Sequence, residues 1–215
     1  MNFEPSLASD SEGVLPRSSW ARTIGWISFA LCCGGCVSTG ELAEHPAVQG
    51  ALPKDIRSVV IRAMPINAGA VKNVEKLTST DAPPLFAGYV KDALALKQPG
   101  WQINLAGAEG VATGQDLTIT TELLEVDGGS AALRFWIGLN TGSTLSRVKV
   151  SILDATGKDL AHAKITERTD CPVGACTESN EASVNRNLKN LAAEVAEFVV
   201  DPAGYEKKKG SKPKT

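Results

Sequence analysis

The sequence predicts an α+β fold, a two-layer sandwich in which two helices cover one face of a largely antiparallel sheet of about five strands. Two stretches, 85–94 and 184–199, repeat apolar residues at three-to-four spacing, as amphipathic helices do. Between them, short segments rich in β-branched residues are separated by turn signals. With 215 residues, 43% of them hydrophobic, the chain is long enough for one core and too short for two full domains.

The first predicted elements form a strand, helix, strand series, in a domain expected over residues 56–201. Residues 56–64 predict a mostly buried strand that Pro65 ends. Asp81 is the expected N-cap of the first helix, which Pro99-Gly100 terminates. A short second strand is expected over 101–105.

The second half of the domain is predicted to be strands followed by a helix. Residues 116–126 predict a third strand. Residues 147–153 alternate apolar and polar side chains, and the turn at 154–159 leads into a strand at 160–169, which indicates a hairpin. The last helix is expected to be capped by Asn180 and to end before Pro202.

The first 35 residues have the order of a signal peptide. Arg17 and Arg22 precede the apolar run 24–31, and polar residues follow too soon for a transmembrane helix, which needs about 20 apolar residues. Because residues 1–16 are acidic where a signal peptide is positively charged, we expect translation to begin near Val14 or Leu15.

The segment Gly34-Gly35-Cys36 resembles the lipobox at which bacterial lipoproteins are cleaved and acylated. Cys36 is therefore the predicted lipidation site, and residues 36–55 are expected to form a flexible tether. Residue 37 is Val and not Asp, which by resemblance to the enterobacterial sorting rule indicates the outer membrane, inner leaflet, facing the periplasm. The alternatives are acylation at Cys33 and a zinc site built by Cys32, Cys33 and Cys36.

An exported chain meets an oxidising compartment, which bears on the remaining two cysteines. Cys171 and Cys176 enclose a Pro- and Gly-containing loop and are predicted to form a disulfide bond with each other. A redox-active pair is the alternative, although four residues intervene where the usual redox motif has two.

Charge is unevenly distributed along the chain. Residues 36–205 hold 15 Lys and Arg against 20 Asp and Glu, a net charge of −5, which disfavours nucleic acid as a partner. Residues 202–215 are rich in Lys and are expected to be a disordered tail.

A further resemblance rests on two motifs. Arg134, Gly138 and Gly142 form an R-x-x-x-G-x-x-x-G segment, and residues 154–158 read D-x-T-G-K between two strands. The chain resembles a family of small bacterial lipoproteins known only as a domain of unknown function. The resemblance supplies no catalytic residues and implies an envelope location.

No residue pattern indicates catalysis, a metal site or a cofactor. His45 lies in the expected tether, and His162 stands alone in a strand, so no His-centred triad is available. The apolar segment Arg134-Phe135-Trp136-Ile137 is the candidate surface for a partner or ligand. The alternative is that these side chains cover the end of the sheet and complete the core. We therefore expect a non-catalytic module, tethered to the membrane by acyl chains, that binds an envelope protein. The alternative is a carrier that holds a hydrophobic ligand or lipid beside that segment.

Overall fold

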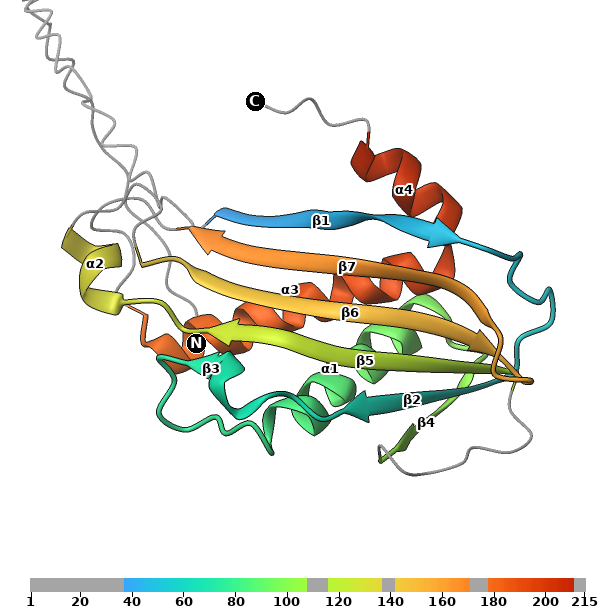
Figure 1. The fold of residues 1–215 in the computed structure, drawn as a ribbon, viewed down its shortest axis with the longest axis horizontal. Coiled ribbons are helices and arrows are strands. Elements are labelled where there is room, and N and C mark those ends of the chain that lie inside the picture. Colours follow the sequence, from blue (N-terminus) through green and yellow to red (C-terminus); the bar gives the residue numbers. More distant parts are fainter. Residues whose placement is uncertain (1–36, 108–115, 137–141, 171–177, 211–215) are drawn as a thin grey trace, which may run out of the picture. The chain divides into compact units, whose positions relative to one another are not determined.

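The protein is built around a seven-stranded mixed sheet with helices on one side (Figure 1). This computed structural model describes residues 37–107, 116–136, 142–170 and 178–210. The strands are β1 (Val37–Val48), β2 (Ser58–Met64), β3 (Val71–Lys72), β4 (Gln102–Ala106), β5 (Leu117–Asp127), β6 (Thr144–Asp154) and β7 (Asp159–Asp170). The helices are α1 (Ala82–Lys97), α2 (Ala131–Trp136), α3 (Asn180–Val200) and α4 (Pro202–Gly210), with a 3₁₀ turn, η1, at Ala68–Ala70.

The predicted fold class, a largely antiparallel sheet of about five strands with two helices, is wrong. The sheet has the strand order β1-β7-β6-β5-β2-β4, with β3 also paired to β5. Strand β2 is parallel to both β4 and β5, and β3 is parallel to β5, whereas β1, β7, β6 and β5 are antiparallel neighbours. The described residues also contain four α-helices and not two.

The parallel pairs follow from the connection through α1. Strand β2 leads into α1, and the chain returns to β4 in register with β2, with Ser58 opposite Gln102. A parallel strand pair needs such a crossover, and a helix is its usual form. The helix and both strands were predicted from the sequence, but their direction was not.

Strand β1 lies where a flexible tether was expected. Residues 37–48 pair antiparallel with β7, from Val37 opposite Asp170 to Val48 opposite Ala161, with two register shifts. Cys33–Thr215 accordingly group into one compact unit. Because residues 37–48 are polar and contain Pro46, they show no strand alternation, and their order comes from pairing with the neighbouring strand.

The two long helices begin as their sequences suggest, with one change of cap each. Ser179, and not Asn180, caps α3, and its hydroxyl accepts a hydrogen bond from the N–H of Ala182 at 3.2 Å. Asp81 precedes α1 without a side-chain cap, since its carboxylate accepts a hydrogen bond from the Thr78 hydroxyl at 2.6 Å.

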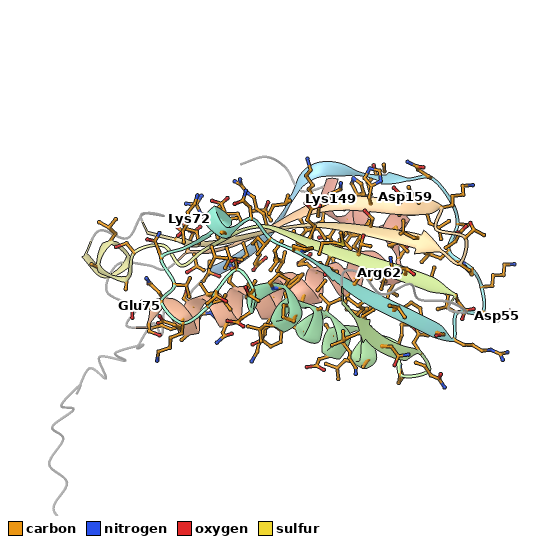
Figure 2. All side chains as sticks on the ribbon, turned by 60° about the horizontal axis from the view of Figure 1, so that its bottom comes forward. Asp55, Arg62, Lys72, Glu75, Lys149 and Asp159 are labelled. Carbon is orange, nitrogen blue, oxygen red and sulfur yellow. The ribbon has the colours of Figure 1, made fainter. Side chains whose placement is uncertain are left out.

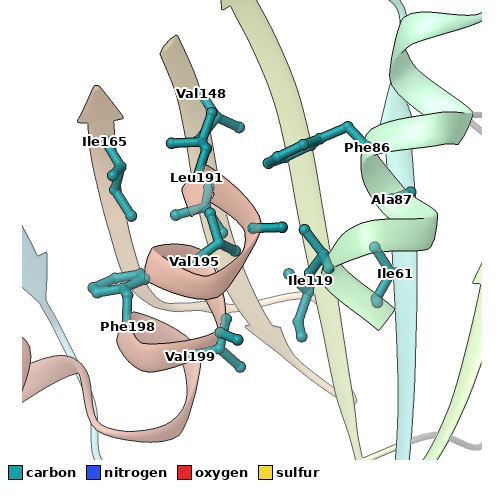
Figure 3. Close-up of a cluster of buried hydrophobic side chains, with 14 of the residues drawn as sticks. Ile61, Phe86, Ala87, Ile119, Val148, Ile165, Leu191, Val195, Phe198 and Val199 are labelled. Carbon is teal, nitrogen blue, oxygen red and sulfur yellow. The ribbon is translucent and has the colours of Figure 1, made fainter. Parts of the chain in front are cut away.

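The core lies between the sheet and the pair α1 and α3 (Figure 3). Alternate residues of β5, β6 and β7 face the helices, and apolar side chains at helical spacing on α1 and α3 meet them. The fully buried members include Ile61, Phe86, Leu94, Leu117, Ile119, Ile152, Ile165, Leu188 and Phe198.

Helix α4 occupies most of the segment that was expected to be disordered. Tyr205 is 2% exposed, and its ring packs edge-on against Phe198, with centroids 5.7 Å apart. Its hydroxyl donates to Glu194 Oε2 at 2.8 Å, while Lys209 donates to Oε1 of the same carboxylate at 2.9 Å and Lys208 pairs with Glu197. Burial, with the hydrogen bond to Glu194, raises the pKa of Tyr205, so the phenol stays protonated and donates. These contacts hold α4 on α3.

Asp116 joins the starts of β5 and β2. Its Oδ2 accepts hydrogen bonds from the N–H groups of Arg57 at 2.6 Å and Ser58 at 2.9 Å. These two bonds, that of Arg57 first, lower the pKa of Asp116 below its ordinary value. The ionised carboxylate is therefore the form that the folded state favours.

We expect Asp116→Asn to lower stability at neutral pH and to matter less in acid. Because the folded pKa is depressed, the contribution of Asp116 is fully present above its unfolded pKa, about 3.9, and is lost as pH falls through the folded value. Thermal unfolding of both proteins between pH 7 and pH 3 measures this. A difference in Tm that stays constant over this range would contradict the assignment.

Candidate functional site

The side of the sheet opposite α1 and α3 is the largest candidate surface, and we call it the open face. Odd-numbered residues of β6 and even-numbered residues of β7 point to this side, because their neighbours on the other side are buried in the core. Figure 2 shows the sheet edge-on with the helices on one side of it and Lys149 on the other. The open face carries mostly polar and charged residues, namely Arg62, Thr120, Glu122, Arg147, Lys149, Ser151, His162 and Lys164.

The centre of the open face is basic. Lys149 lies opposite Glu122 on one neighbouring strand and opposite Lys164 on the other. Directly opposed side chains on a sheet have Cβ atoms about 5 Å apart, so two lysines in this register repel each other. Arg62 of β2 lies opposite Thr120, which is two residues before Glu122 on β5.

Arg62 and Lys149 form no ion pair with another residue in the described ranges. Lys149 is exposed. Arg62 Nε is buried, and it makes no hydrogen bond within the part of the chain that the structure describes. A buried donor without an acceptor is costly, so this position lowers the stability of the fold in the described residues.

Charged side chains in the outer parts of the open face form ion pairs with one another. Arg147 forms an ion pair with Glu125 at 3.3 Å, and Glu125 also lies 3.5 Å from Lys72. His162 Nδ1 lies 2.7 Å from Asp159 Oδ2, with both side chains about one third exposed. His162 is thus partnered by a carboxylate near the hairpin turn, and it does not stand alone among strand histidines, because His45 lies in β1.

A second candidate surface lies at the end of the sheet where β5 finishes and β6 begins, and we call it the α2 end (Figure 1). Gly129 starts the connection with a φ of 64°, and a Cβ there would lie 2.2 Å from the carbonyl oxygen of Gly142 and 2.4 Å from that of Ser143. Only glycine fits such a close approach of two backbones. Ser130 then donates its N–H to the Gly142 carbonyl at 3.2 Å, which closes the loop that presents α2.

The predicted surface residues Arg134, Phe135 and Trp136 belong to the backbone of α2, and their side chains lie outside the description. Leu133 of the same helix is 40% exposed. Ile137 lies outside the described residues, as do Cys36, Cys171 and Cys176. The predicted lipidation and disulfide sites therefore stay predictions.

Several buried polar side chains hold α3 beside the α2 end. The hydroxyls of Thr144 and Ser183 lie 2.6 Å apart, and the Asn187 amide donates to the Thr169 hydroxyl at 3.0 Å. All four residues are at most 1% exposed. These hydrogen bonds join the helix to strands β6 and β7.

Two hollows stand out on the described surface. One, of about 610 Å³, lies between residues 73–75, Ala131 and the start of α3 at 179–181. The other, of about 440 Å³, is lined by residues 52–57, Gln98, Trp101 and Val200. Both are open to solvent, and polar or charged residues form much of their walls.

The described residues contain neither a cluster of metal ligands nor a membrane-spanning helix. Within 37–107, 116–136, 142–170 and 178–210, no three His, Cys, Asp or Glu side chains come close enough together to hold a metal ion. None of the helices in these ranges is long and apolar enough to cross a membrane.

Sequence reasoning placed the strand residues that build the open face but did not identify the face as a site. The alternation of Arg147 and Lys149 with buried Val148 and Val150 was visible and predicted which side chains point outward. The position of Arg62 beside Thr120 on the open face could not be predicted, because it depends on the parallel pairing of β2 with β5.

Known proteins resemble this chain in fold and in part of its sequence. Among solved structures, the PelC dodecamer from Paraburkholderia phytofirmans is similar, with 12% identity, a TM-score of 0.44 and coverage of 73% of this chain and 96% of that one. A DUF330 protein from Xanthomonas campestris has 10% identity, a TM-score of 0.44 and coverage of 76% and 97%. No curated protein sequence matches. Residues 66–169, from the end of β2 to the end of β7, match the family described as "Domain of unknown function (DUF4410)".

Proposed function

We propose that this chain is a non-catalytic interaction module of the bacterial cell envelope, held by acyl chains on Cys36 at the inner leaflet of the outer membrane. The open face of the sheet docks an acidic segment of an envelope protein. The observation that carries the proposal is a pair of cations, Arg62 and Lys149, that form no ion pair within the part of the chain that the structure describes and lie at the centre of a sheet face that α1 and α3 leave uncovered.

The charges of the open face favour an acidic partner. Lys149 lies opposite one carboxylate, Glu122, and opposite one lysine, Lys164, and Arg62 lies on the neighbouring strand β2, while the domain as a whole is acidic. A partner carboxylate near Lys149 and Arg62 would pair with two cations that form no ion pair among the described residues. Complementary charge of this kind selects a partner and speeds its association.

The carrier alternative gains no support from the described residues. A hydrophobic ligand needs an apolar cavity, and the space between sheet and helices is filled by core side chains such as Phe86, Leu94 and Ile119. The hollow beside α2 is lined by Asn73, Glu75 and Glu181 among others, which suits water better than a lipid.

The test removes the two unpaired cations together. Full-length, acylated protein carrying Arg62→Gln and Lys149→Gln is compared with wild type in a quantitative pull-down from the native envelope. A close ion pair at an interface is worth about 1.5 kcal/mol or more, so losing two lowers the affinity roughly a hundredfold. Rising salt should weaken the wild-type interaction as well.

The matched control removes two positive charges from the helix side, with Lys91→Gln and Lys97→Gln on α1. We expect the control to retain the same envelope protein as wild type. The proposal fails when wild type enriches no defined protein, or when the open-face variant and the α1 control retain it equally.

A further inference from the structure

The start of β1 fixes where a lipid on Cys36 would sit. Val37 is the first residue of β1 and lies opposite Asp170, the last residue of β7. Cys36 directly precedes Val37 in the sequence, so acyl chains on Cys36 would join the fold at this sheet position. The flexible tether that would let the domain turn freely above a membrane is replaced by a paired strand.

That sheet position belongs to the α2 end. Thr169 of β7 pairs with Thr144 at the start of β6, and Leu145 pairs with Asp127 at the end of β5. Helix α2 connects these two strand ends. In Figure 1 the start of β1 and α2 accordingly lie at the same end of the sheet.

The sequence of α2 suits a membrane interface. Within six residues it contains Leu133, Phe135 and Trp136, with Arg134 among them. Leu133 is 40% exposed, a large fraction for a leucine in a folded domain. Tryptophan and other aromatic side chains concentrate at the boundary between headgroups and hydrocarbon, where arginine reaches the phosphates.

We infer that the α2 end rests on the bilayer and that α2 is a membrane-contact element, with the sheet standing away from the membrane and the open face turned to the periplasm. This inference rests on the proposed acylation of Cys36. The partner that it assigns to α2 is the lipid surface of the membrane. The occupant follows from the chain itself, because acyl chains on Cys36 bring lipid to this end of the sheet and to no other.

The opposite end of the sheet supplies an internal control. In a chain processed to begin at Cys36, the tryptophans are Trp101 and Trp136. Trp101 precedes β4 beside the start of β2, where Val59 pairs with Leu117 at the first residue of β5. The eleven residues of β5 separate the two ends by roughly 35 Å.

The experiment reads the depth of each tryptophan separately. Acylated protein is reconstituted into vesicles of phosphatidylethanolamine and phosphatidylglycerol, with brominated acyl chains as the fluorescence quencher. Trp101→Phe leaves Trp136 as the emitter, and Trp136→Phe leaves Trp101. We expect brominated lipid to remove most of the Trp136 emission and to leave the Trp101 emission unchanged. Cys36→Ser protein, exported with a cleaved, non-acylating signal peptide in place of residues 1–35, should lose the Trp136 quenching.

Two readouts separate this inference from the proposed function. The mass of the amino-terminal peptide reports whether Cys36 carries acyl chains. Trp136 that stays unquenched in acylated protein overturns the membrane contact and leaves the tethered-module proposal intact. In that case, a crosslink from position 133 of α2 to another protein would assign α2 to a protein partner instead. A peptide without acyl chains overturns the inference together with the anchor.

Discussion

Replacing Phe198 by Ala is expected to lower the free energy of unfolding by about 3–5 kcal/mol. Phe198 is fully buried on α3 and contacts the ring of Tyr205 edge-on at 71°. Its loss leaves a cavity between α3, α4 and the sheet, and it removes an aromatic pair worth roughly 0.5–1.5 kcal/mol. Urea denaturation followed by circular dichroism measures the change.

The matched control for Phe198→Ala is Leu96→Ala on α1. Leu96 is 86% exposed, so its replacement should change stability by less than about 0.5 kcal/mol. Similar losses for the two variants would show that α3 and α4 do not enclose the core as described. A small effect of Phe198→Ala alone would point to α4 leaving α3 in solution.

When residues 1–35 are replaced by a secretory signal peptide that is cleaved without acylation, Cys36→Ser is expected to move nearly all of the protein from the membrane fraction to the soluble periplasmic fraction. Each buried CH₂ of an acyl chain contributes about 0.8 kcal/mol, so several chains bind firmly and their removal leaves no comparable anchor. Fractionation with immunodetection measures the distribution.

Cys33→Ser is the control for the lipidation site, because Cys33 is the competing acceptor three residues earlier. We expect this variant to stay in the membrane fraction. Release by Cys33→Ser, or retention of Cys36→Ser in the membrane fraction, would contradict acylation at Cys36.

The elements with strong local periodicity were predictable from the sequence. The helices at 82–97 and 180–200 and the hairpin of β6 and β7 are confirmed, because each buries a stripe or face whose period is visible in the residues. The turn between β6 and β7 is likewise encoded locally, since Asp154 Oδ1 accepts hydrogen bonds from the N–H groups of Thr156 and Lys158.

The missed features depend on partners distant in the chain. Residues 37–48 become a strand through pairing with β7, and α4 is ordered by Glu194 and Phe198 of α3, so neither carries its own signal. The direction of β2 relative to β5 was missed for a related reason, because 52 residues lie between Met64 and Leu117 and alternation does not encode direction. The crossover through α1 was the available clue.

The two candidate sites also differ in how much of each could be predicted from the sequence. Arg134 to Ile137 could be singled out as an unusual apolar segment, but the place of α2 at the end of the sheet where β1 begins emerges only from the register of β1 with β7. The basic centre of the open face unites residues from β2, β5, β6 and β7. These residues are neighbours only because of the order of the strands in the sheet.

Site-specific photocrosslinking in living cells tests most directly whether the open face binds a partner. A benzophenone amino acid at position 149 is compared with the same group at position 97, on the helix side of the sheet. The proposed function predicts a discrete protein adduct of defined mass from position 149 and none from position 97. No adduct from position 149, or the same adduct from both positions, would contradict docking on the open face.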